Sequence, residues 1–190
     1  MENPYTGLPE DQWKSRTAEL VNQHPLDSAL IRETILQSWE DILNTKIAGE
    51  LSFGIDYFPT PQMLGNFLHT VIPIRLGKAT GSAWRIGTGN IEKDLVYIPD
   101  DTFSIEIKTS SSNTIYANRS YAQPNTAGKL KDGYYLGINF ETFKTSETPM
   151  IKQIKFGWLN HNDWIPQKSP TGQQARLSAF TWKNKFLDLL

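Results

Sequence analysis

The chain has 190 residues and a mass of 21.6 kDa, the size of one globular domain, so we expect a single domain over residues 1–190. With 38% hydrophobic residues and no cysteine, the sequence excludes global disorder, a disulfide framework and thiolate chemistry, and leaves oxygen as the main ligand for any metal. The first residues do not resemble a secretion signal and no apolar run is long enough to span a membrane, so we expect a cytoplasmic protein with no membrane partner.

The net charge of −1 conceals an asymmetry between the two halves of the chain. Residues 1–104 carry a balance of −6, whereas residues 105–190 carry +5. Residues 107–131 contain four basic side chains and no acid. A positive region of this kind suits a polyanion such as nucleic acid, and a solvated surface without a partner explains the charge equally well.

The first part of the chain has the spacing of helices. Apolar residues recur at helical intervals between Asp27 and Lys46, and Asp27 is a suitable N-cap. A helix is also expected from about Asp11 to Gln23. Thr60 followed by Pro61 is a second N-cap signal, so a third helix should start there.

After Trp84 the sequence changes to short β-branched or alternating runs. Strands are expected at Leu95–Ile98, Phe103–Lys108, Tyr134–Phe140 and Lys152–Trp158. The tail should be a loop from Pro170 and then a helix or extended arm from Leu177. The expected fold is a mixed α/β (α+β) domain in which helices flank a small mixed sheet.

The run from Asp94 to Lys108 contains the most informative arrangement of charges. In a strand at 103–108, Glu106 and Lys108 point to one face while Ile105 and Ile107 point to the other. A turn at residues 99–102 brings Asp94 back beside Glu106. Two carboxylates and the Ile107 carbonyl can hold Mg²⁺, and Lys108 would then orient or deprotonate a water, or stabilise charge on a phosphate.

Two features of this hairpin leave alternatives. An ordinary surface hairpin with a cross-strand Glu–Lys pair has the same pattern. An odd-length connection sets Asp94 opposite Glu106, whereas a two-residue turn points Asp94 to the apolar face. We predict the odd connection or a bulge with the same effect.

Asp100 follows a proline but lies in the turn, about 20 Å from Glu106 along an extended strand. A helical acid often completes such sites, and the candidates are Glu33, Glu40 and Glu50.

Several segments resemble the PD-(D/E)XK nuclease superfamily, and within it the type II restriction endonucleases of the ScaI-like group. The segments that carry the resemblance are residues 92–97, 106–110, 118–121, 133–136 and 172–175. The resemblance extends from about Trp13 to the C-terminus. It implies a restriction-endonuclease-like core with Asp94 and Glu106 as metal ligands and Lys108 as the catalytic lysine. Lys93 stands where the superfamily motif has proline, which affects the chemistry little because the carboxylate performs it.

Polar residues after the catalytic strand are candidates for contacts with DNA. Amides can pair with adenine and arginine with guanine in the major groove, and lysine and tyrosine can reach phosphates. A polar surface connection without a ligand is the alternative. The candidate DNA-binding residues are Asn118, Arg119, Tyr121, Gln123, Lys129, Gln173, Gln174 and Arg176.

The predicted function is a Mg²⁺-dependent type II restriction endonuclease that cuts a short palindromic site in double-stranded DNA. The alternatives are a repair or resolvase nuclease of the same fold, or a catalytically silent DNA- or carbohydrate-binding module. Because one site attacks one strand at a time, a homodimer is expected, with an interface on the helical front or the apolar C-terminal arm. Burial of that arm within its own domain is an equal alternative.

Overall fold

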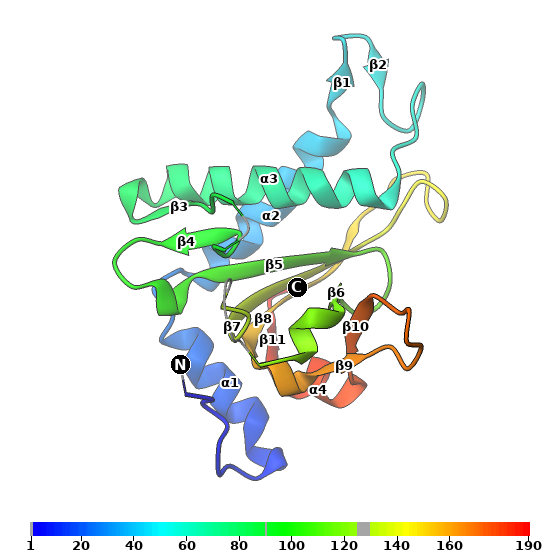
Figure 1. Cartoon of the computed structure of the whole chain (residues 1–190). Coiled ribbons are helices and arrows are strands. Elements are labelled where there is room, and N and C mark those ends of the chain that lie inside the picture. Colours follow the sequence, from blue (N-terminus) through cyan, green and yellow to red (C-terminus); the bar gives the residue numbers. More distant parts are fainter. Residues whose placement is uncertain (1, 90, 125–129) are drawn as a thin grey trace.

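A six-stranded mixed sheet forms the centre of the molecule in the computed structural model, which describes residues 2–89, 91–124 and 130–190 (Figure 1). Its strands β5 and β7 run parallel, and the other neighbours in the sheet are antiparallel. In spatial order the strands are β11 (Phe186–Asp188), β8 (Ile151–Leu159), β7 (Gly133–Phe140), β5 (Ile105–Ser110), β4 (Leu95–Tyr97) and β3 (Trp84–Ile86). The expected class, a small mixed sheet flanked by helices, is confirmed.

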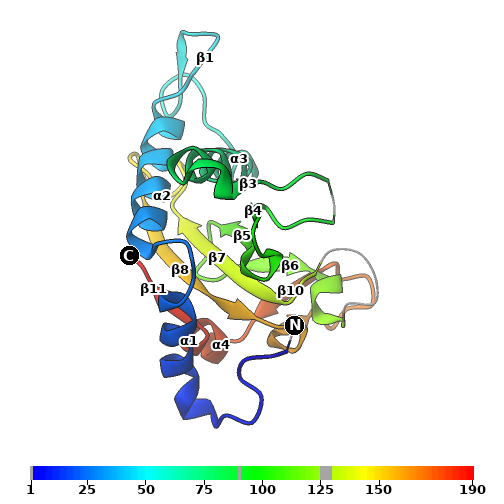
Figure 2. The same ribbon diagram turned by 90° about the vertical axis from the view of Figure 1, so that its left-hand side faces the viewer.

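Three helices pack against one face of this sheet: α1 (Trp13–Asn22), α2 (Ser28–Leu43) and α3 (Pro61–Ala79). Figure 2 shows α1 and α2 on one side of β7 and β8. The predicted caps are present, because the Asp27 side chain accepts a hydrogen bond from the Leu30 amide at 2.9 Å and Thr60 caps α3 ahead of Pro61. In the part of the chain that the structure describes, no helix combines the length and apolar character needed to span a membrane.

A short hairpin separates α2 from α3. It consists of β1 (Lys46–Ile47) and β2 (Leu51–Ser52), and it projects beyond the two helices (Figure 1). Glu50, which was considered as a helical acid, lies in the turn of this hairpin and is exposed. Nearby apolar side chains are also exposed, including Ile55 and Phe58.

The strand that carries the predicted site begins two residues later than expected. Residues Asp101–Phe103 form a 3-10 turn capped by the Asp100 side chain, so β5 starts only at Ile105. Phe103 still packs against the same core as Ile105 and Ile107, which are completely buried beneath the helices. The predicted separation of apolar and polar faces therefore holds within β5.

The opposite face of the central sheet is covered by a second, three-stranded sheet and a short helix. The elements are β6 (Tyr116–Asn118), β10 (Gln174–Leu177), β9 (Trp164–Pro166) and α4 (Ala179–Asn184). Their apolar side chains form a core with Tyr135 and Leu159 of the central sheet. The tail after Pro170 is thus not only a loop, because it includes β10. The C-terminal arm forms α4 and then the edge strand β11, in which Phe186 is fully buried.

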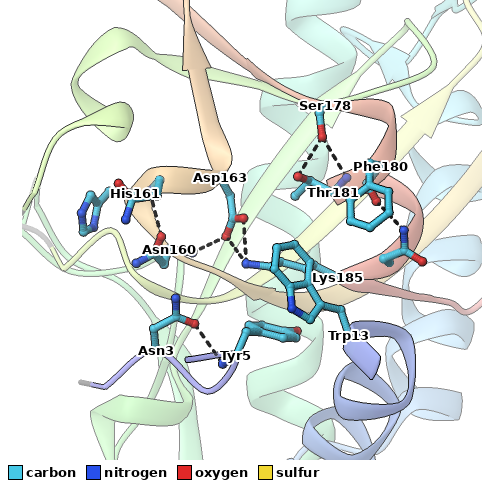
Figure 3. A network of polar contacts seen from close by, with 12 residues as sticks. Asn3, Tyr5, Trp13, Asn160, His161, Asp163, Ser178, Phe180, Thr181 and Lys185 are labelled. Carbon is cyan, nitrogen blue, oxygen red and sulfur yellow. Dashed lines mark hydrogen bonds and ion pairs between the residues drawn. The ribbon is translucent and has the colours of Figure 1, made fainter. Parts of the chain in front are cut away.

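A buried ion pair links the C-terminal arm to the turn before β9, close to the N-terminal helix (Figure 3). The Lys185 ammonium lies 2.7 Å from Asp163 Oδ1, and both residues are less than 9% exposed. The same ammonium sits 4.3 Å from the ring centre of Tyr5 and 4.2 Å from that of Trp13. Cation–π contacts and the carboxylate together compensate the lysine for its lost hydration.

Candidate active site

The hairpin between β4 and β5 has the predicted register. Leu95 pairs with Ile105, so Asp94 falls opposite Glu106 and the odd-length connection is confirmed. Asp94 lies just before β4, and its Oδ2 accepts a hydrogen bond from the Ile107 amide at 2.7 Å. Since the N–H and C=O of one strand residue point to the same side, the Ile107 carbonyl also faces the edge occupied by Asp94.

Glu106 and Lys108 form a largely buried pair on the face of β5 that points away from Ile105 and Ile107, together with Tyr121. Glu106 Oε1 lies 2.6 Å from Lys108 Nζ and 2.6 Å from the Tyr121 hydroxyl. Lys108 Nζ also lies 3.3 Å from that hydroxyl and 4.6 Å from the ring centre. Beneath them, burial raises the pKa of Tyr135 well above its usual value, and the charge of Glu106 acts in the same direction. Tyr135 therefore stays protonated and donates to the Lys131 carbonyl.

Helix α3 contributes a histidine to this region in place of an acid. His69 Nδ1 lies 3.7 Å from Asp94 Oδ2, and both side chains are partly exposed. By contrast, Glu33 and Glu40 lie on α2 and line a groove with basic side chains of α3. Among the described residues, no three His, Asp or Glu side chains form a group that could hold a metal ion. No sequence pattern points to His69 as part of this site, because its approach to Asp94 depends on how α3 packs against the sheet.

Lys93, which stands where the expected nuclease motif would have proline, is buried beside the start of β7. It is 5% exposed, and its ammonium donates to the Asp132 carbonyl at 3.1 Å. Gly133 has a φ of 136°, and a Cβ at this position would overlap the Lys93 ammonium. The backbone conformation therefore favours glycine here, and any larger residue would also displace the Lys93 ammonium.

An open pocket of about 290 Å³ adjoins Lys108, and residues of the small sheet line it. Asn118 of β6 pairs with Gln174 of β10, and Tyr116 pairs with Arg176. Because Ala175 and Leu177 point inward, these four side chains share the exposed face of the small sheet. Three predicted DNA-binding residues, Asn118, Gln174 and Arg176, are therefore brought together next to the pocket.

The other predicted DNA-binding residues have different surroundings. Arg119 donates to the carbonyls of Ser169, Pro170 and Gly172, so its guanidinium fastens the loop before β10. Tyr121 is only 8% exposed and points into the site. Gln123 and Gln173 are exposed. Lys129 lies outside the described residues.

The sequence matches one family of DNA-cleaving enzymes over nearly its whole length. A family model described as ScaI restriction endonuclease matches residues 3–190. The type II restriction enzyme ScaI of Streptomyces caespitosus is 39% identical over 191 residues, which cover 98% of this chain and 84% of that enzyme. No solved structure gives a significant match. The chain therefore belongs to the ScaI restriction endonuclease family, and it is a type II restriction endonuclease.

Proposed function

We propose that this enzyme hydrolyses both strands of a short palindromic site in double-stranded DNA, in the cytoplasm, through a PD-(D/E)XK site. Asp94, Glu106 and the Ile107 carbonyl are the proposed ligands of Mg²⁺, and Lys108 is the proposed catalytic lysine. The hydrogen bond from the Ile107 amide to Asp94 carries the proposal, because it brings a carboxylate to the strand edge that the Ile107 carbonyl also faces.

The donor set fits Mg²⁺ better than a softer metal. Mg²⁺ prefers oxygen ligands, keeps several waters and is commonly bound through one or two carboxylates, and the proposed ligands from this chain are all oxygen atoms. When bound, such an ion supplies Lewis-acid activation of water and neutralises phosphate charge. Lys108 then orients or deprotonates the attacking water, or stabilises the charge on the phosphate.

The exposed face of the small sheet is the proposed DNA-contacting surface. A two- or three-stranded ribbon fits the major groove, where Asn118 and Gln174 offer amides for adenine and Arg176 offers a guanidinium for guanine or phosphate. Lys108 and this face border the same pocket, so bases would be read close to the scissile phosphate. Gln123 and Gln173 are proposed to contact the DNA backbone nearby, and Lys129, outside the described residues, remains a proposed phosphate contact from its sequence alone. Arg119 contributes by holding the loop that leads into β10.

We further propose that the enzyme is a homodimer, because a duplex with two-fold symmetry presents two equivalent phosphates and each domain has one site. Residues 47–58 form the proposed contact. This segment belongs to the helical front, projects from the body (Figure 1) and exposes Ile47, Leu51, Ile55 and Phe58 by 38–76%. The C-terminal arm is a poorer candidate since β11 is part of the central sheet.

The test of the catalytic assignment is digestion of long DNA with Mg²⁺, followed by sequencing of the ends. The wild-type enzyme should give discrete fragments that require a divalent metal. Asp94→Ala, Glu106→Ala and Lys108→Ala should each abolish cutting, and Lys108→Ala should still bind Mg²⁺ because an ammonium group is not a ligand.

Asp100→Ala is the matched control, because Asp100 is an exposed carboxylate of the same hairpin that only caps the 3-10 turn. It should cut like the wild type. Normal cleavage by Asp94→Ala, Glu106→Ala or Lys108→Ala would refute the site. Metal-dependent DNA binding without any cleavage would instead support the silent binding module.

A further inference from the structure

Tyr121 connects the small sheet to the charged pair of the central sheet. It lies in the 3-10 turn Arg119–Ala122, which follows β6 directly, and its ring packs edge-on against Trp164 of β9 with centroids 5.8 Å apart. From there its hydroxyl reaches Glu106 Oε1 at 2.6 Å. The residue is 8% exposed, so this contact is shielded from bulk water.

The hydroxyl is placed between the two charged groups. It lies 2.6 Å from the Glu106 carboxylate, to which it donates, and 3.3 Å from Lys108 Nζ, from which it accepts. The face of the same ring lies 4.6 Å from the ammonium. One side chain thus constrains the orientation of the carboxylate and the location of the ammonium. The charge-assisted bond to the carboxylate, at 2.6 Å, is the short and strong one of the two.

We propose that Tyr121 is a positioning residue for hydrolysis, which holds the Glu106 carboxylate and the Lys108 ammonium in the geometry needed for metal binding and cleavage. The inference rests on the proposed function, because that proposal assigns the roles of Glu106 and Lys108. Tyr121 acts through these two residues. On this proposal its role needs no contact with DNA, since its hydroxyl is bonded to the Glu106 carboxylate.

A tyrosine with only a structural role would affect stability without affecting metal binding. Burying a hydroxyl requires some partner, and loss of that partner costs stability whatever its role. Only a positioning role also lowers the affinity for Mg²⁺ and the rate of cleavage. Outer contacts to metal-binding carboxylates typically alter metal affinity or activity by about 10–100-fold when removed.

The experiment compares Tyr121→Phe with the wild type. This substitution keeps the ring, its packing on Trp164 and its contact with Lys108, and removes only the hydroxyl. We expect Mg²⁺ binding, measured by calorimetry, to weaken by about 10–100-fold, together with a fall in the single-turnover cleavage rate. The affinity for DNA without metal should be unchanged.

Tyr134→Phe is the matched control. Tyr134 is similarly buried, lies on the helix-covered face of β7 and bonds the Leu20 carbonyl at 3.3 Å, so its variant should bind Mg²⁺ and cut normally. Thermal unfolding of both variants measures the cost of losing a hydroxyl from the fold.

Two results would overturn the inference. Wild-type Mg²⁺ binding and cleavage in Tyr121→Phe, with or without a lower melting temperature, would leave a structural role only. Weaker DNA binding with an unchanged response to Mg²⁺ would make Tyr121 a DNA contact. Failure of the proposed function is distinct from both, because Glu106→Ala would then cut DNA.

Discussion

His24 is a buried imidazole surrounded by aromatic rings. The ring centre lies 4.5 Å from that of Tyr134 and 4.8 Å from that of Phe156. Its Nδ1 accepts from the Leu26 amide at 3.1 Å, so Nε2 carries the hydrogen that is donated to the Phe103 carbonyl at 2.9 Å. Burial lowers the pKa of His24 to about 4, and the charge of Lys93 acts in the same direction.

This histidine predicts a loss of stability in acid. Because the unfolded chain binds a proton near pH 6.5 and the folded chain only near pH 4, the free energy of unfolding should fall as the pH is lowered between these values. The contribution of His24 to this fall is about 3 kcal/mol. Urea unfolding of the wild type and of His24→Gln at pH 7 and pH 4.5 measures it. An equal fall in both proteins would assign the acid sensitivity to other groups.

At the scale of elements, the Lys185–Asp163 pair fixes the C-terminal arm to the rest of the fold (Figure 3). Asp163 also accepts from the Asn160 amide at 2.9 Å and so caps the turn before β9. Asp163→Ala leaves the Lys185 ammonium buried without its carboxylate, and we expect the free energy of unfolding to drop by about 3–5 kcal/mol. Urea denaturation is the measurement.

The control for this prediction is Glu19→Ala, which removes an exposed ion pair with Arg16 on α1. Exposed pairs contribute about 0–1 kcal/mol because water and salt screen them. If both variants lost the same small free energy of unfolding, the buried pair would not be the interaction that holds the C-terminal arm.

The facing strands β6 and β10 give a prediction for DNA recognition. Asn118→Ala and Gln174→Ala should each weaken binding to the cognate duplex by about 1–3 kcal/mol and relax the choice of base at one position, because each removes a proposed base-edge contact. Fluorescence anisotropy with cognate and altered duplexes tests this. Gln37→Ala, on the exposed side of α2, is the control and should change nothing. Equal weakening on all sequences would mean that Asn118 and Gln174 contact only the backbone.

The sequence predicts the elements whose signals are local. The caps at Asp27 and Thr60 and the β-branched runs of β4, β5, β7 and β8 lie within single windows, and so does the alternation that pairs Glu106 with Lys108. The small sheet could not be predicted in the same way. Its strands have three or four residues each, and β6 pairs with β10, which lies far along the chain.

The same distinction explains the candidate site. The register that sets Asp94 opposite Glu106 follows from the length of one hairpin, which the sequence contains. The contacts of Tyr121 with Glu106 and of His69 with Asp94 join separate elements through tertiary packing. The sequence predicts Tyr121 as a DNA contact, which stays a prediction, and it does not reveal that the Tyr121 hydroxyl bonds Glu106.

For the whole molecule, the proposed homodimer gives a test of the projecting segment. Ile55→Asp and Phe58→Ser place polar groups on the most exposed apolar positions of residues 47–58, so they should convert a dimer into a monomer. Light scattering after gel filtration measures the mass. The monomer should nick one strand of supercoiled plasmid more readily than it cuts both.

Ile98→Asp is the control, since Ile98 is 56% exposed at the end of β4 and lies outside the proposed contact. It should remain dimeric. A wild-type monomer that makes double-strand breaks in one binding event would refute the dimer.

The presence of two separate sheets affects how the enzyme can evolve. The proposed base-reading side chains project from the small sheet, and the proposed hydrolytic side chains belong to the hairpin of the central sheet. A lineage can therefore exchange Asn118, Gln174 or Arg176 and change the sequence it cuts without altering the chemistry of cleavage. Tyr121 limits this exchange, because the turn that follows β6 also bonds Glu106. Insertions or deletions in that turn would therefore change the specificity and inactivate the enzyme at the same time.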